Sequence, residues 1–145
     1  MNSSQQLRQG VYEAYSAVAD QPEAEHPFAV GWAFAAGLGY PIEWLDRLPQ
    51  ASVRAFTGVS NVSIFSDLPA GARVLDLGCG AGMDALIAAE RVGQTGNVLG
   101  VDFSSAMLAR ARRAANEAGR HNLHHCQAAA EALPLASASV DVALA

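Results

Sequence analysis

Apolar residues recur at helical spacing in the first half of the chain. An amphipathic helix is predicted over residues 5–19, because its apolar positions share one face: Leu7, Val11, Tyr15 and Val18. Prolines and glycines divide the apolar residues that follow into three shorter predicted helices, over residues 28–38, 41–48 and 52–56. Residues 1–68 are therefore expected to form a helical segment.

The pattern changes at Pro69, after which short β-rich runs alternate with helices. Helices are predicted over residues 84–92 and 104–118, and Ser104 and Gly119 suit the two ends of the second one. Four strands are predicted, over residues 73–77, 98–101, 123–127 and 140–144. This alternation indicates right-handed βαβ units, so the expected fold class is α/β with a parallel sheet.

Two tyrosines of the first predicted helix, Tyr12 and Tyr15, allow two interpretations. Aromatic residues at helical spacing commonly pack a helix onto its neighbour. Alternatively, both tyrosines belong to a lid that covers a ligand. The sequence leaves the two interpretations open.

The composition narrows the class of protein. With 145 residues, of which 51% are hydrophobic and 16% charged, the chain fits one globular domain. Fourteen acidic residues against nine basic ones give a net charge of −5, which argues against a nucleic-acid binder with a broad cationic face. The sequence shows no apolar signal core and no membrane-spanning stretch, and Cys79 and Cys126 do not make a secreted disulfide framework. We expect a soluble, cytoplasmic protein without a membrane or nucleic-acid partner.

A glycine-rich loop over residues 78–82 (GCGAG) follows the first predicted strand and lets a ligand approach the backbone. Asp76 lies near the end of that strand, close to where this loop would hold a pyrophosphate. Two like charges about 4 Å apart cost about 4 kcal/mol at an effective dielectric constant of about 20. Met83 also stands where the dinucleotide fingerprint needs its third glycine. A ligand with an ammonium or sulfonium group therefore fits this loop better than a dinucleotide.

Asp102 ends the second predicted strand, 20 residues after Gly82. In a nucleotide-binding parallel sheet, an acidic residue at this place accepts hydrogen bonds from the ribose hydroxyls. The simpler interpretation is an acidic residue at the start of a helix, beside Ser104. Together with the glycine loop, the position favours ribose binding.

Three stretches resemble the first three motifs of class I S-adenosylmethionine-dependent methyltransferases: residues 74–84 (VLDLGCGAGMD), 99–110 (LGVDFSSAMLAR) and 130–135 (AEALPL). The chain is most similar to the branch that holds ubiquinone/menaquinone and arsenite methyltransferases. The resemblance covers about residues 69–145. It implies a partial Rossmann-like domain there, with residues 1–68 as a helical segment or lid. It also implies S-adenosyl-L-methionine as cofactor and a small-molecule methyl acceptor.

The resemblance further implies a role for each residue of the donor site. The loop residues Gly78, Cys79, Gly80 and Gly82 would form the floor under the methionine part, and Asp76 would hold the ammonium group. Asp102 would bind the ribose hydroxyls. The adenine side is then expected to involve Phe103, Met107, Ala130 and Glu131, although Met107 fits a helix core equally well. No catalytic residue is predicted.

The sequence departs from the family pattern in its side chains. Ala129 stands where the family usually has an Asp that binds the adenine amine, so one charge-assisted hydrogen bond is lost. Residues 58–61 lack the thiol that arsenite methyltransferases carry in this region, so no arsenic site is expected. The sequence HNLHHC at residues 121–126 places His124 and His125 on opposite faces of a strand, so no metal site is expected either.

The chain also stops in its fourth predicted strand, whereas the methyltransferase sheet normally has seven. We expect a truncated methyltransferase or a fragment that keeps the donor half, lacks the acceptor half, is inactive alone and self-associates through its exposed sheet edge. One alternative is a binding module without catalysis. Another is a nicotinamide-dependent oxidoreductase, against which Asp76 and Met83 argue.

Overall fold

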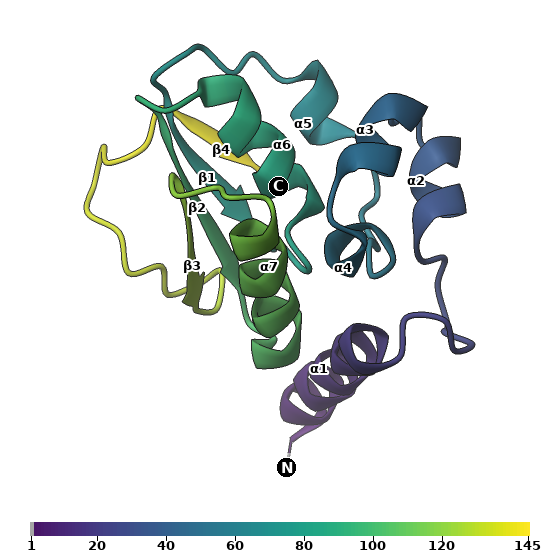
Figure 1. Cartoon of the computed structure of the whole chain (residues 1–145). Coiled ribbons are helices and arrows are strands. Elements are labelled where there is room, and N and C mark those ends of the chain that lie inside the picture. Colours follow the sequence, from purple (N-terminus) through teal and green to yellow (C-terminus); the bar gives the residue numbers. More distant parts are fainter. Residues whose placement is uncertain (1) are drawn as a thin grey trace.

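A parallel sheet of four strands lies at one side of the molecule, with the helices beside it (Figure 1), as seen in a computed structural model. The structure describes residues 2–145; Met1, the first residue of the predicted helical segment, lies outside the described residues. The strand order is β3-β2-β1-β4. The strands are β1 (Arg73–Leu77), β2 (Asn97–Asp102), β3 (Leu123–Gln127) and β4 (Val142–Leu144). The expected α/β fold with a Rossmann-like parallel sheet is confirmed.

Two helices connect the first three strands and pack beside each other on one face of the sheet (Figure 1). Helix α6 (Met83–Val92) links β1 to β2, and α7 (Ser105–Glu117) links β2 to β3. The Ser104 side chain accepts a hydrogen bond from the Met107 N–H, which confirms Ser104 as the N-cap of α7. Because all four strands are parallel, their carboxyl ends meet at one edge of the sheet, where α/β proteins bind ligands.

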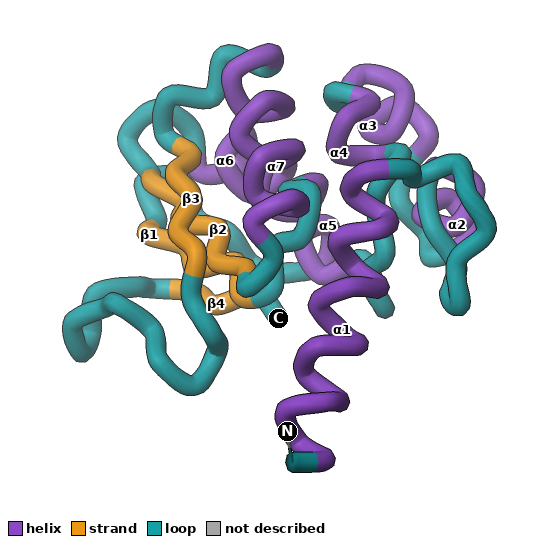
Figure 2. Tube along the Cα trace, turned by 90° about the horizontal axis from the view of Figure 1, so that it is seen from below, coloured by secondary structure: helices purple, strands orange, loops and turns teal. Residues whose placement is uncertain are grey.

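Five helices precede the sheet (Figure 2). They are α1 (Ser3–Asp20), α2 (Trp32–Gly37), α3 (Ile42–Arg47), α4 (Gln50–Val53) and α5 (Val62–Phe65). Helices α1 and α4 lie beside α7 and α5 lies beside α6, whereas α2 packs on α3. The helix predicted over residues 28–38 is wrong in its first turn, because Gly31, with φ +94°, is the N-cap and α2 begins only at Trp32. Helix α5 was not predicted, since its four residues are too few to show a period.

The main hydrophobic core extends across residue 68 without a break. Leu45 and Phe56 from the N-terminal half belong to the same buried cluster as Val74, Leu86 and Ile87. Helix α1 instead belongs to a smaller cluster, made of Val18, Ala19, Ala55, Ala81 and Met107. Helices α2–α5 thus share a core with the sheet, and α1 is the element that best fits the predicted lid, which stays a prediction.

No helix within residues 2–145 combines the length and the apolar character that a membrane crossing needs.

Candidate functional site

The glycine loop leaves β1 at the carboxyl edge of the sheet and turns into α6. Its three glycines adopt positive φ angles, +71° at Gly78, +53° at Gly80 and +86° at Gly82. A Cβ atom added at Gly78 or Gly80 would meet nothing within 4 Å, so these two residues leave open space beside the backbone. At Gly82 it would lie 3.0 Å from the Ala111 Cβ, so Gly82 allows α7 to approach the loop. Two of the glycines therefore face space for a ligand and the third serves packing.

Asp102 fixes the shape of this loop from the end of β2. Its Oδ2 accepts a hydrogen bond from the Gly80 N–H at 2.8 Å, and its Oδ1 accepts one from the Ser104 N–H at 2.8 Å. A carboxylate offers about four acceptor positions, so two of them remain for a ligand. Burial raises the pKa of Asp102. Asp102 is thus the helix-start acid of the simpler interpretation and keeps acceptor capacity next to the open face of the loop.

Asp76 carries a buried carboxylate oxygen that has no partner among the described residues. The side chain is only 5% exposed, and its Oδ2 makes no hydrogen bond. Burial, with smaller contributions from the negative charges of Asp84 and Asp102, raises the pKa of Asp76 to about 8. A buried polar atom without a partner is costly. A cationic group bound at the loop would supply the missing contact.

A further acid, the half-buried Asp84 in the first turn of α6, ties the N-terminal helices to the loop. Its Oδ1 accepts hydrogen bonds from the Tyr40 hydroxyl, at 2.5 Å, and from the Ser63 hydroxyl. The Ser52 hydroxyl donates to the Ala81 carbonyl at 2.5 Å. Sequence reasoning missed all four of these side chains. Of the four, only Asp84 was recognisable from the sequence, because acidic residues are favoured in the first turn of a helix.

The adenine side was predicted to involve Phe103, Ala130 and Glu131, and the structure brings these three together. They line a hollow of about 330 Å³, together with Leu7, Arg8, Val11 and Ala129. Two tyrosines of α1 lie against Phe103, with ring centroids 6.0 Å away for Tyr12 and 6.1 Å away for Tyr15. The structure shows the packing role of these tyrosines, because both rings lie against Phe103. Their part in a lid stays a prediction.

Two predicted cofactor residues point away from the hollow. Met107 is 1% exposed and packs in the small cluster under α1, as the helix-core alternative required. The Cys79 side chain is buried behind the loop, where its Sγ would lie 2.9 Å from a Cβ added at Gly100. Burial raises the pKa of this thiol, which disfavours a reactive thiolate. Cys79 therefore contributes only its main chain to the open side of the loop.

The histidines near β3 do not converge. His124 is exposed, whereas His125 is half-buried, and burial lowers the pKa of His125 to about 4. Within residues 2–145, no three His, Cys, Asp or Glu side chains come together as metal ligands.

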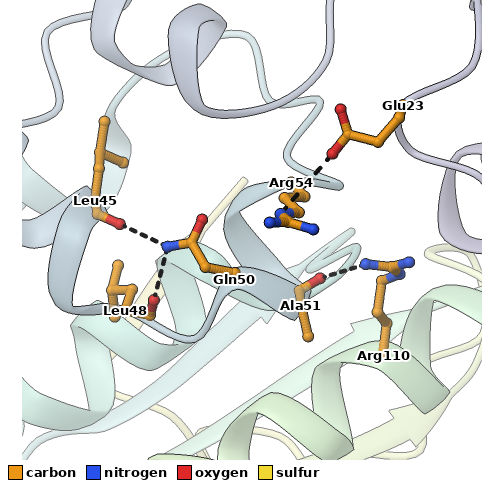
Figure 3. A network of polar contacts seen from close by, with 7 residues as sticks. All are labelled: Glu23, Leu45, Leu48, Gln50, Ala51, Arg54 and Arg110. Carbon is orange, nitrogen blue, oxygen red and sulfur yellow. Dashed lines mark hydrogen bonds and ion pairs between the residues drawn. The ribbon is translucent and has the colours of Figure 1, made fainter.

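Arg110 of α7 contacts two N-terminal helices, and Figure 3 shows its hydrogen bond to Ala51 of α4. Its guanidinium donates to the Ala19 carbonyl of α1 at 2.6 Å and to the Ala51 carbonyl of α4 at 3.1 Å. Nearby, Arg54 and Glu23 form an exposed ion pair at 3.8 Å. The two backbone contacts place the C-terminal turn of α1 against α7, and thereby position its N-terminal turns next to Phe103.

Comparisons with known proteins agree with this geometry. Residues 68–145 match the family model described as "Methyltransferase domain". The chain is 37% identical over 87 residues to an arsenite methyltransferase of Halobacterium salinarum, and the aligned region makes up 60% of this chain and 22% of that protein. It is 40% identical over 72 residues to a demethylmenaquinone methyltransferase of Lactococcus lactis, and the aligned region makes up 50% of this chain and 29% of that protein. The chain thus spans less than a third of these two curated relatives.

Among solved structures, the chain is similar to an arsenic(III) S-adenosylmethionine methyltransferase from Chlamydomonas reinhardtii. The TM-score is 0.54 and the sequence identity 30%. The superposition covers 79% of this chain and 38% of that one. It therefore extends beyond residues 68–145 into the N-terminal helices.

Proposed function

The chain belongs to the methyltransferase-domain family, and from this premise we propose that it forms the donor-binding part of an S-adenosyl-L-methionine-dependent methyltransferase that acts on a small molecule. One observation carries the proposal. The unpartnered, buried oxygen of Asp76 lies beside a glycine loop that Asp102 holds open. A nucleoside with a cationic amino-acid tail matches both features.

Four groups of such a donor correspond to four parts of the site. Asp76 receives the ammonium group, and the open faces of Gly78 and Gly80 accommodate the methionine chain. Asp102 accepts hydrogen bonds from the ribose hydroxyls, and Phe103 packs against the adenine. A pyrophosphate in place of the methionine chain offers Asp76 no cationic group, and whenever Asp76 is ionised it would repel the pyrophosphate by about 4 kcal/mol at about 4 Å. This argues against the nicotinamide dinucleotide alternative.

When bound, S-adenosyl-L-methionine supplies a methyl group on a positively charged sulfur, which leaves as a neutral thioether. The residues of this chain contribute by position, because holding the reactants in line accounts for much of the acceleration in such displacements. Asp102 fixes the loop through Gly80, and Ser52 fixes it through the Ala81 carbonyl. No side chain of this chain is assigned as a general base.

The proposed acceptor is a small molecule, because the two curated relatives are named for arsenite and for demethylmenaquinone. A thiol-based arsenic site lacks support in this chain. Its cysteines are Cys79, which is buried behind the loop, and Cys126, which lies on β3.

Calorimetric titration with S-adenosylhomocysteine tests the proposal. Asp102→Ala is expected to bind at least about tenfold more weakly than the parent chain, because two charged hydrogen bonds to the ribose are lost. Asp67→Ala, at an exposed acid that precedes β1 and does not line the loop, serves as the matched control. A parent chain that binds NAD but not S-adenosylhomocysteine would overturn the proposal, and so would equal affinities of the Asp102 variant and the parent.

A further inference from the structure

A cleft of about 420 Å³ lies between α4, α7 and the segment that follows α1. Three arginines line this cleft: Arg54 at the C-terminal end of α4, and Arg110 and Arg113 of α7. None of the glycine-loop residues 78–82 lines it. Cavities of about 300–1,000 Å³ accommodate small molecules, so the cleft has a suitable size for a second ligand.

The two arginines of α7 keep hydrogen-bond donors for such a ligand. The Nε and Nη1 atoms of Arg110 donate to the Ala19 and Ala51 carbonyls. A guanidinium has five N–H donors, so three of those on Arg110 remain, including both on Nη2. Arg113 is exposed and, within residues 2–145, its guanidinium makes neither a hydrogen bond nor an ion pair. Unused donors of α7 therefore border the cleft.

The charges around the cleft are only partly balanced. Figure 3 shows Arg54 and Arg110 reaching into the same region beside α4, with Glu23 next to Arg54. Burial and the positive charge of Arg113 lower the pKa of Arg110. The negative charges of Asp20 and Glu23 offset this repulsion only in part. A bound anion would relieve the repulsion between the arginines.

A phosphate group suits this donor set better than a carboxylate does. Guanidinium groups bind both anions through paired, charge-assisted hydrogen bonds. A phosphate monoester presents three acceptor oxygens and a charge of about −1.5 to −2, whereas a carboxylate presents two oxygens and a single charge. Glu23, which forms an exposed ion pair with Arg54 at 3.8 Å, is the competing acid. Because exposed ion pairs are weak, the more highly charged phosphate displaces Glu23 from Arg54.

We propose that this cleft binds the phosphate group of a small phosphorylated molecule through Arg54, Arg110 and Arg113. The inference is independent of the proposed donor binding, because no residue assigned to the donor lines the cleft.

Helix α4 connects the cleft with the glycine loop. The Ala51 carbonyl lies at the cleft, where it accepts the hydrogen bond from Arg110. The hydroxyl of the next residue, Ser52, donates to the Ala81 carbonyl of the loop. A phosphate bound in the cleft therefore contacts the helix that supports the loop.

Thermal unfolding at constant ionic strength tests the proposal, with inorganic phosphate and glycerol 3-phosphate as probes and chloride as the reference anion. A ligand that binds the folded state raises Tm with its concentration, and the rise gives an apparent Kd. Both probes are expected to raise the Tm of the parent chain. Arg113→Gln is expected to bind them at least about tenfold more weakly, because one of the three charged partners is lost. This variant is expected to fold like the parent, since the Arg113 side chain is exposed.

Two further variants distinguish a specific site from a general effect of charge. Arg112→Gln removes the same charge from the adjacent position of α7, which is exposed and does not line the cleft, and it is expected to bind like the parent. Glu23→Gln frees Arg54 from its acid and is expected to bind several-fold more tightly. A parent chain whose Tm does not respond to either phosphate overturns the proposal, and so do equal Kd values for the Arg112 and Arg113 variants.

A lipid headgroup is a second source of the same phosphate chemistry. Sedimentation with vesicles that contain phosphatidic acid, compared with vesicles of phosphatidylcholine alone, measures binding to that source. The proposal expects no sedimentation that depends on Arg113. Vesicle binding that Arg113→Gln abolishes, without a response of Tm to either soluble phosphate, would assign the cleft to a membrane surface and overturn the proposal.

Discussion

The sequence predicts the conformation of some residues at the glycine loop but not the packing role of others. The positive φ angles of Gly78 and Gly80 were foreseeable, because a glycine loop between a strand and a helix demands such backbone. That Gly82 accommodates Ala111 of α7 was not foreseeable, since no local pattern reports which helix approaches the loop. The same holds for Tyr40, which reaches Asp84 from 44 residues earlier in the chain.

Asp76 leads to a prediction about stability and pH. Its pKa in the folded chain is about 8, whereas an unperturbed Asp has a pKa of about 3.9. The folded state therefore holds this proton more tightly than the unfolded state does. The resulting stabilisation is fully present below about pH 4 and is lost as the pH rises through about 8. The raised pKa values of Asp84 and Asp102 act in the same direction.

Asp76→Asn removes this titration, so the free energy of unfolding is expected to fall less between about pH 5 and pH 8 than in the parent. One such titrating group changes the free energy of unfolding by up to about 1.4 kcal/mol per pH unit. Urea denaturation at several pH values measures the difference, with Asp67→Asn at an exposed site as control. Parallel pH curves for the parent and Asp76→Asn would show that the Asp76 carboxylate is not the group that titrates.

Elements with a clear period or sharp boundaries were predicted well. Strands β1 and β3 have the predicted bounds, and α6 begins one residue earlier than expected. β4 is shorter, because only Val142–Leu144 pair with β1, whereas residues 140–144 were predicted. Among the short helices between residues 28 and 65, α3 agrees with the predicted range 41–48 to within one residue at each end. Helix α2 begins four residues later than predicted, α4 (Gln50–Val53) begins and ends before its predicted range of 52–56, and α5 was not predicted.

At this scale, Arg110 is predicted to hold α1 in place. Arg110→Gln removes charged hydrogen bonds to the Ala19 and Ala51 carbonyls, and such bonds contribute about 1.5–3 kcal/mol each. Hydrogen exchange in α1 is expected to become faster, while exchange in β2 stays as in the parent. Arg113→Gln, at an exposed position on the same helix, is the control. Unchanged protection of α1 would contradict the role of Arg110.

For the whole molecule, the site follows from the topology of the sheet. In a parallel sheet the segments after β1, β2 and β3 meet at one edge, so the loop, Asp102 and Glu131 were predictable as neighbours from the strand order in the sequence. The arrangement of α1 over Phe103 was not predictable, because it depends on contacts between segments about 90 residues apart, such as Tyr12 with Ser105.

The sheet also leads to a prediction about association. β4 pairs with β1 on one side, and within residues 2–145 no strand pairs with its other side. Strands of parallel sheets are apolar, and an unpaired strand edge offers backbone groups to a second chain. The chain is therefore expected to self-associate through β4 as its concentration rises.

Two variants test this prediction. Ala143→Lys, at an exposed position of β4, places a charge on this edge and should reduce association. Ala70→Lys, at an exposed turn, adds the same charge elsewhere and should leave association unchanged. Sedimentation velocity at several concentrations distinguishes the three chains, and a parent chain that stays monomeric throughout would refute the prediction.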